Sequence, residues 1–134
     1  MGGNFIDTNI LIYLASGDER KADAAEAVVR QGGTISVQVL NEFVNVARRK
    51  LDFSWSELSS FLKVIRELLH VVPLTVATHE RGMQLAQRHQ LSIYDGMILA
   101  AALESGCETL YTEDLQHGMS VMGVTVVNPL KSKE

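Results

Sequence analysis

The stretch NFIDTNIL, residues 4–11, indicates how the whole chain is organised. Residues 4–7 are predicted to form a short strand, because apolar side chains lead into the turn signal Asp7-Thr8-Asn9. A short helix is predicted to follow through Tyr13. A strand that passes directly into a helix begins a strand–helix alternation, and the rest of the sequence continues it.

The remainder of the chain alternates between strand-like and helix-like segments. Short apolar or β-branched runs predict strands at residues 34–37, 71–75, 108–112 and 124–127. Amphipathic spacing, capping signals and glycine stops predict helices over residues 19–31, 40–47, 54–69, 77–90 and 92–103. Strands separated by helices favour a parallel sheet that is covered on both faces. The predicted fold class is therefore α/β, a three-layer α/β/α sandwich with a central, mainly parallel sheet.

The length and composition fit one ordered domain. The chain has 134 residues, which predicts a single domain over residues 1–130 and a frayed polar tail at residues 131–134. Cys107 is the only cysteine, so an intrachain disulfide and a cysteine zinc cluster are excluded, and a cytoplasmic location is expected. The longest apolar run, residues 97–103, is far too short to span a bilayer, so no membrane association is expected.

The charge balance is mildly acidic, with 12 basic and 16 acidic residues and a net charge of −4. This chain alone is not expected to bind duplex DNA, because binding a duplex by charge needs a basic surface. Setting four acids aside leaves 16 − 4 = 12, which balances the 12 bases, so the excess fits one focused acidic site. The run Arg48-Arg49-Lys50 is predicted to be a solvated helix end that suits the helix dipole, with an RNA contact as the alternative.

Four carboxylates fall where the elements of such a sheet begin and end. Asp7 ends the first strand, and Asp114 lies two residues beyond the strand at 108–112. Glu42 lies in the first turns of the helix after the second strand, and Asp95 lies in the first turn of a helix that is apolar on nearly every side. The carboxyl ends of parallel strands share one edge of a sheet, so these acids are predicted to converge there.

Four converging carboxylates suit a hard divalent cation. Mg²⁺ and Mn²⁺ prefer oxygen ligands, and no His or Cys spacing typical of zinc is present. One or two such ions are therefore expected as cofactors. Each acid also has a structural interpretation: a helix cap for Asp7, a solvated helix residue for Glu42, part of a Ser92–Asp95 capping box for Asp95, and a loop acid for Asp114.

Four short motifs resemble those of PIN domains, and most closely those of the small bacterial VapC-type toxins of type II toxin–antitoxin systems. The segments that carry the resemblance are Asp7-Thr8-Asn9-Ile10-Leu11, Asn41-Glu42-Phe43, Tyr94-Asp95 and Thr112-Glu113-Asp114-Leu115. The likeness covers the whole chain and ends at residues 126–129. One departure is Gly96, where the family more often has Ala or another helix former.

The resemblance implies a divalent-metal-dependent endoribonuclease that uses a metal-activated water and leaves a 5′-phosphate and a 3′-hydroxyl. The residues that it implies as both catalytic and metal-binding are Asp7, Glu42, Asp95 and Asp114. It gives supporting roles to Thr8 or Asn9 and to the Thr112 hydroxyl, which would orient the acids by hydrogen bonds. The implied partners are an RNA substrate, a cognate antitoxin protein and a second copy of the chain in a homodimer.

Two other functions compete with the nuclease. A haloacid-dehalogenase-like phosphatase also uses an Asp after its first strand, but that chemistry needs a second Asp two residues later, where this chain has Asn9. A non-catalytic PIN-like interaction module would be expected to have lost one or more of the four acids, and none is lost.

Overall fold

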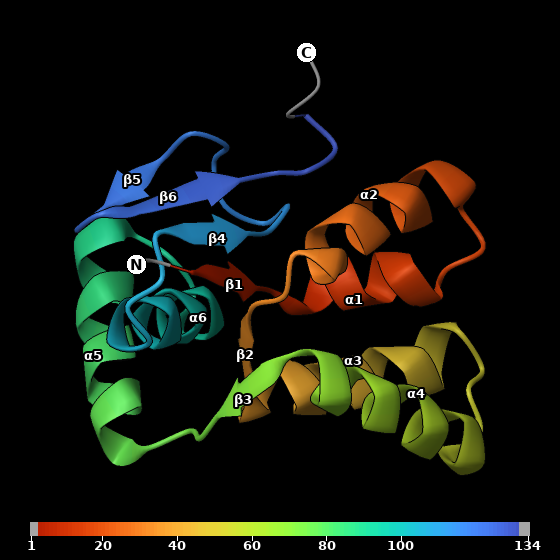
Figure 1. The fold of residues 1–134 in the computed structure, drawn as a ribbon. Coiled ribbons are helices and arrows are strands. Elements are labelled where there is room, and N and C mark those ends of the chain that lie inside the picture. Colours follow the sequence, from red (N-terminus) through yellow and green to blue (C-terminus); the bar gives the residue numbers. More distant parts are fainter. Residues whose placement is uncertain (1–2, 132–134) are drawn as a thin grey trace.

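The computed structural model describes residues 3–131 and shows six helices and six strands within that range (Figure 1). The strands are β1 (Asn4–Ile6), β2 (Thr34–Ser36), β3 (His70–Val72), β4 (Thr109–Tyr111), β5 (Ser120–Val121) and β6 (Val124–Val127). The helices are α1 (Thr8–Ala15), α2 (Glu19–Arg30), α3 (Val37–Lys50), α4 (Trp55–Leu68), α5 (Val76–His89) and α6 (Ile93–Glu104). Residues 132–134, which make up most of the predicted polar tail, lie outside the described part of the chain.

The strands form one sheet in the order β3-β2-β1-β4-β6-β5. All neighbouring pairs are parallel except the β5–β6 pair, which is antiparallel. In Figure 1, α5 and α6 lie to the left of the sheet and α1 to α4 lie to its right. The predicted α/β class with a central, mainly parallel sheet is confirmed. Because β1 lies between β2 and β4, the chain leaves these three strands at adjacent points of one edge, which is where α/β folds bind ligands.

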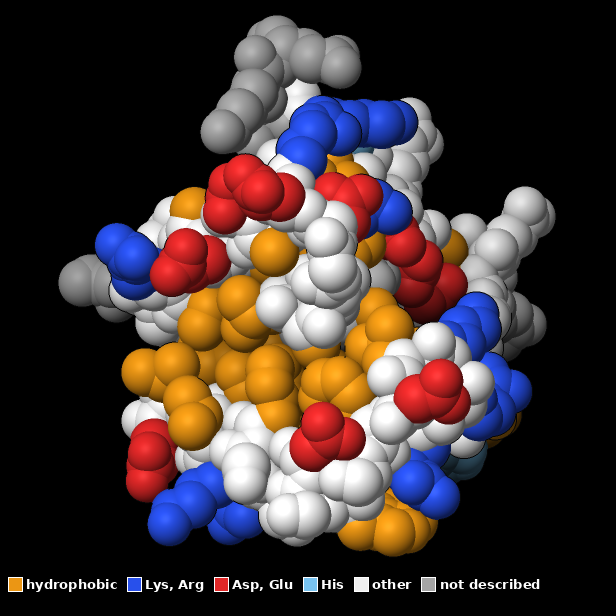
Figure 2. Space-filling model, turned by 90° about the vertical axis from the view of Figure 1, so that its right-hand side faces the viewer, with side chains coloured by type: hydrophobic (Ala, Val, Ile, Leu, Met, Phe, Trp, Pro, Cys, Tyr) orange, Lys and Arg blue, Asp and Glu red, His pale blue; other side chains and the backbone are white. Residues whose placement is uncertain are grey.

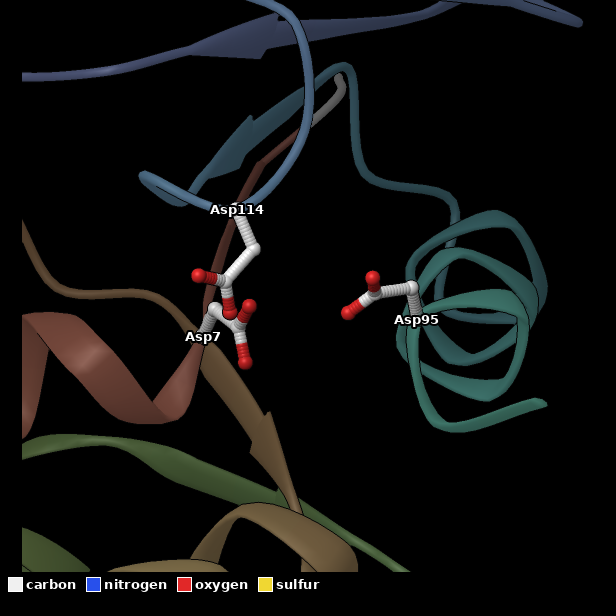
Figure 3. A group of neighbouring side chains, drawn as sticks. All are labelled: Asp7, Asp95 and Asp114. Atoms are coloured by element: carbon white, nitrogen blue, oxygen red, sulfur yellow. The ribbon is translucent and has the colours of Figure 1, made fainter. Parts of the chain in front are cut away.

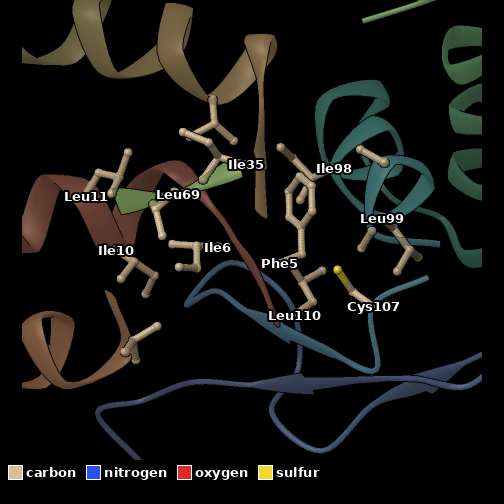
Figure 4. Packing of buried hydrophobic residues seen from close by; sticks show 14 of the residues in the cluster. Phe5, Ile6, Ile10, Leu11, Ile35, Leu69, Ile98, Leu99, Cys107 and Leu110 are labelled. Atoms are coloured by element: carbon tan, nitrogen blue, oxygen red, sulfur yellow. The ribbon is translucent and has the colours of Figure 1, made fainter. Parts of the chain in front are cut away.

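The strands are short, and the central strands β1 and β2 are buried on both faces, as expected for a parallel sheet covered by helices. Phe5, Ile6, Ile35 and Leu110 are fully buried, and Figure 4 shows Phe5 and Leu110 packed beside Cys107 and the α6 residues. Full burial of such a side chain contributes roughly 1.5–3 kcal/mol. Cys107 is part of this core. Its burial raises the pKa of the thiol, so the thiol stays protonated.

One strand prediction is wrong in detail and one strand was not predicted, and both have physical reasons. The strand predicted at residues 71–75 is β3 and ends at Val72, because Pro73 has no N–H to donate to a neighbouring strand. Thr75 instead caps α5, with its side chain accepting a hydrogen bond from the Thr78 N–H. The two-residue strand β5 is too short to give a sequence signal.

Along residues 3–131, no helix is long and apolar enough to cross a membrane.

The unusual Gly96 is explained by the close packing of α6 against α5. A Cβ placed on Gly96 would lie 2.4 Å from the Gly82 carbonyl oxygen and 3.0 Å from the Ala86 Cβ. A Cβ on Gly82 would meet Met97 in the same way, at 2.6 Å from its Cγ. The two glycines therefore allow the helix backbones to approach, and this contact sets the position of the α6 turn that carries Asp95.

We expect Gly96→Ala to lower the free energy of unfolding by about 1–3 kcal/mol, the range for overpacking a tight contact. Ala gains about 1 kcal/mol in helix propensity, but the nearest obstacle is a backbone oxygen that cannot move aside alone. Gly17→Ala is the matched control, because its Cβ would meet nothing within 4 Å. Urea unfolding of both variants measures the effect, and equal stability of Gly96→Ala and wild type would contradict the packing explanation.

Candidate metal centre

Asp7 is placed by the junction of β1 and α1, where it also caps the helix. Its backbone N–H donates to the Tyr111 carbonyl at 3.0 Å, which extends the pairing of β1 with β4 by one residue. Its Oδ1 accepts from the Thr8 N–H at 2.7 Å, and its Oδ2 accepts from the Thr112 hydroxyl at 2.7 Å. The residue is 4% exposed. The helix-cap interpretation of Asp7 is thus correct, and it does not exclude a place in the acidic site.

The structure brings three of the four predicted acids together. Asp7, Asp95 and Asp114 each offer one carboxylate oxygen, and these three oxygens lie within 4.8 Å of one another. Figure 3 shows Asp7 and Asp114 side by side and Asp95 facing them from the first turn of α6. The Ser92 hydroxyl caps that turn by accepting from the Asp95 N–H at 3.0 Å. The full capping box expected at Ser92 and Asp95 is wrong: over residues 3–131 the reciprocal pair of bonds occurs in α4, between Ser54 and Glu57.

Glu42, the fourth acid, lies in the same cleft but outside the group of three. It comes from α3, which begins after β2 where the Ser36 side chain caps the helix. Its Oε1 accepts from the Thr8 hydroxyl at 2.7 Å, and its Oε2 accepts from the Gln38 side-chain amide at 3.2 Å. Both carboxylate oxygens therefore have a donor from the protein, so the carboxylate is held in one orientation.

The three residues predicted to support the acids all bond to them. Thr8 bonds to Glu42, and Thr112, which is fully buried, bonds to Asp7. The Asn9 side-chain amide donates to Asp114 Oδ2 at 3.0 Å and to the Thr112 hydroxyl at 3.3 Å, and its oxygen accepts from the Glu113 N–H. Asn9 and Thr112 thus connect the loop after β1 to the loop after β4 and fix Asp114 beside Asp7.

These acids line a cleft with a volume of about 550 Å³. The side chains around it are Asp7, Thr8, Asn9, Ile12, Tyr13, Glu42, Asn45, Val46, Lys50, Tyr94, Asp95, Ile98, Glu113 and Asp114. Lys50 is the one cation among the lining residues of the described chain. Tyr94, which precedes Asp95, is 63% exposed at this cleft. The cleft therefore combines a cluster of acids with one basic and one aromatic side chain that remain accessible.

Burial and repulsion from neighbouring acids raise the pKa values of three acids at this cleft, Asp7, Asp95 and Glu113. Burial raises the pKa of Asp7 to about 7, and the charges of Asp114 and Glu42 add to this effect against the opposing hydrogen bonds. Burial, followed by repulsion from Asp114, also raises the pKa values of Asp95 and Glu113. A divalent cation would relieve this repulsion, and an all-oxygen donor set suits a hard ion. The residues present therefore fit a divalent metal.

Several cleft residues were not predicted from the sequence. Asn45 lines the cleft three residues after Glu42, and helical spacing places it on the same face of α3. Gln38, four residues before Glu42, lies on that face too and bonds to Glu42 from beside the cleft lining. Lys50 lies two turns beyond Glu42 on that face, so the predicted solvated end of α3 contributes one side chain to the cleft. The Tyr13 hydroxyl donates to Glu113, a contact between residues 100 positions apart that no sequence pattern indicates.

Comparison with known proteins agrees with this architecture. The profile of the PIN domain family matches residues 5–118. Similar solved structures include a toxin–antitoxin complex from Klebsiella pneumoniae, with 27% identity, coverage of 94% of this chain and 97% of that chain, and a TM-score of 0.72. No match was found among curated proteins.

Two further structures share the fold at lower identity. One is VapC20 of Mycobacterium tuberculosis, described as a sarcin–ricin loop cleaving toxin, with 20% identity, coverage of 83% and 91% of the two chains, and a TM-score of 0.66. The other is VapBC2 of Rickettsia felis, bound to a DNA fragment from its promoter, with 18% identity, coverage of 92% and 96%, and a TM-score of 0.64.

Proposed function

This chain belongs to the PIN domain family, and from that premise we propose that it is a divalent-metal-dependent endoribonuclease and the toxin of a toxin–antitoxin pair. The observation that carries the proposal is the group of three carboxylate oxygens, from Asp7, Asp95 and Asp114, within 4.8 Å of one another. The similarity to a sarcin–ricin loop cleaving toxin and to toxin–antitoxin complexes supports the biological role.

The chain's own residues would bind and orient. Asp7, Asp95 and Asp114 would hold Mg²⁺ or Mn²⁺, as one ion or two, and Glu42 would complete the acidic wall. A bound ion of this kind lowers the pKa of water and stabilises negative charge on a phosphodiester. Thr112, Asn9 and Thr8 would keep the acids in place through their hydrogen bonds. Lys50 would attract the substrate phosphate at the edge of an otherwise acidic cleft.

A cleavage assay tests this function. The purified protein should cut single-stranded or loop RNA with Mg²⁺ or Mn²⁺, leave 5′-phosphate ends, and stop in EDTA. The same preparation should not hydrolyse a small phosphate ester, which separates the nuclease from the phosphatase alternative. Cleavage of RNA by homogeneous protein in EDTA would contradict the metal-dependent mechanism. Failure to cut any RNA sample with metal present would favour the non-catalytic interaction module.

We also propose a small antitoxin as partner. Figure 2, which faces the side formed by α1 to α4, shows hydrophobic side chains gathered on that face. Leu14, Val29 and Leu68 line a groove of about 320 Å³ between α1, α2 and α4, and Leu68 is 56% exposed. A protein segment with apolar side chains fits such a groove, and a following Arg or Lys would suit the acidic cleft.

A homodimer is part of the same proposal. Light scattering on the purified chain at micromolar concentration measures its mass in solution, and a strict monomer would remove the dimer. Inhibition of RNA cleavage by the product of the neighbouring gene tests the antitoxin separately.

A further inference from the structure

Gln38 connects two walls of the cleft through one side-chain nitrogen. It lies in the first turn of α3 and is 7% exposed. Its Nε2 donates to Glu42 Oε2 at 3.2 Å and to the backbone carbonyl of Tyr94 at 3.2 Å. The first bond stays on α3, since Glu42 follows Gln38 by four residues. The second reaches the first turn of α6, one residue before Asp95.

An amide side chain is well suited to this position. Both partners, a carboxylate oxygen and a backbone carbonyl oxygen, only accept hydrogen bonds, and an amide nitrogen carries two hydrogens in fixed directions. A carboxylate there would repel Glu42, and an apolar side chain would donate to neither partner. The Thr8 hydroxyl occupies the other oxygen of Glu42, at 2.7 Å. Gln38 and Thr8 together therefore allow the Glu42 carboxylate little freedom to rotate.

We propose that Gln38 is a positioning residue, which fixes the Glu42 carboxylate toward the metal centre by tying it to the backbone of α6. This inference rests on the proposed function. Glu42 stands outside the three-acid group, so its carboxylate can serve the centre only from a defined orientation. The link to Tyr94 couples that orientation to the turn that carries Asp95. Outer partners of this kind typically change metal affinity by 10–100-fold when removed.

The test is Mn²⁺ titration of purified protein by calorimetry, with no RNA present. Gln38→Met keeps the length of the side chain and removes the donor, and we expect it to weaken Mn²⁺ binding about 10-fold. Adding Gln38→Met to a Glu42→Ala background should change Mn²⁺ affinity less than about 2-fold, because the residue through which it acts is gone. Gln84→Met, at an exposed glutamine on α5 outside the cleft, is the matched control and should bind Mn²⁺ like wild type.

Two further measurements distinguish positioning from folding. In RNA cleavage, Gln38→Met should lower kcat and leave KM nearly unchanged, because the side chain does not contact the open part of the cleft. Gln38→Glu keeps the shape and cannot donate, so it should reproduce the loss of Mn²⁺ affinity if Gln38→Met proves unfolded. An equal loss in the wild-type and Glu42→Ala backgrounds, or no loss at all, overturns the inference. Failure of the wild-type protein itself to bind Mn²⁺ contradicts the proposed function, and the role of Gln38 falls with it.

Discussion

Asp7→Asn should abolish RNA cleavage and yet leave the metal-free protein at pH 8 more stable than wild type. Asp7 is 4% exposed, lies within 4.8 Å of two other acids through its carboxylate oxygen, and has its pKa raised to about 7 from 3.8. The variant keeps the shape of the side chain and removes its charge. We expect the rate of RNA cleavage to fall at least about 100-fold. Loss of a residue that only hydrogen-bonds to a metal ligand already costs up to about 100-fold, and Asp7 is itself a candidate ligand.

The stability of this variant should depend on pH in a defined direction. A carboxyl with a raised pKa binds its proton more tightly in the folded state, so the wild-type protein loses stability as pH rises from about 4 to about 7. Raising the pKa of Asp7 from 3.8 to about 7 corresponds to roughly 4 kcal/mol of lost stability above that window. Asn carries no such charge, but its NH₂ group replaces one of the two carboxylate oxygens. Oδ1 accepts from the Thr8 N–H and Oδ2 accepts from the Thr112 hydroxyl, so one of these bonds is lost, which costs about 1–2 kcal/mol.

Urea unfolding in EDTA at pH 5 and pH 8 measures the balance of these terms. We expect Asp7→Asn to be about as stable as wild type at pH 5, where the rise in pH has already cost wild type about 1–2 kcal/mol, and about 2 kcal/mol more stable at pH 8. Mn²⁺ should stabilise wild type more than the variant, because it binds the folded state. Asp52→Asn is the control: Asp52 is exposed and has φ 56°, a conformation that Asn also adopts. A variant clearly less stable at pH 8 with cleavage intact would make Asp7 a structural cap alone.

Thr112→Val should lower both stability and activity, whereas Thr112→Ser should restore most of each. The fully buried Thr112 hydroxyl donates to Asp7 and accepts from the Asp114 N–H at 3.0 Å and from Asn9 at 3.3 Å. Val has the same shape but leaves these groups unpaired, at about 1–3 kcal/mol for each buried group. We expect the free energy of unfolding to fall by about 3 kcal/mol and cleavage to fall about 10–100-fold.

The serine variant separates the hydroxyl from the methyl group. Thr112→Ser keeps every hydrogen bond and loses one buried methyl, at a cost of about 1 kcal/mol. Urea unfolding and RNA cleavage under one set of conditions compare the two variants. If Thr112→Val cleaves RNA as well as Thr112→Ser does, the hydroxyl does not orient the acids.

The sequence predicts the architecture because the signals that set it are local. The strand, turn and cap at residues 4–11 place Asp7, and the alternation of segments implies the parallel sheet that carries Asp114 to the same edge. Side-chain orientation was not predictable in the same way. Glu42 bonds to Thr8 and Gln38 and lies outside the group of three acids. This arrangement depends on how α3 approaches α1, and no local sequence pattern predicts that approach.

Gly96 illustrates the same limit. From the sequence it is only a poor helix former beside a candidate ligand. Glycine fits at position 96 because a side chain there would collide with the backbone oxygen of Gly82. Gly82 lies 14 positions earlier in the chain, on the helix that packs against α6. Local propensity and spacing predict which elements carry the acids. Tertiary contacts decide how closely the carboxylates approach one another.

The most direct test of the shared metal site is anomalous diffraction from crystals grown with Mn²⁺. We expect one strong peak, or a close pair of peaks, at roughly 2.0–2.6 Å from carboxylate oxygens of Asp7, Asp95 and Asp114. The peak should disappear in Asp7→Asn crystals grown under the same conditions. A wild-type crystal that shows no Mn²⁺ among these three carboxylates, from protein that cleaves RNA in the same Mn²⁺ buffer, would contradict the metal centre.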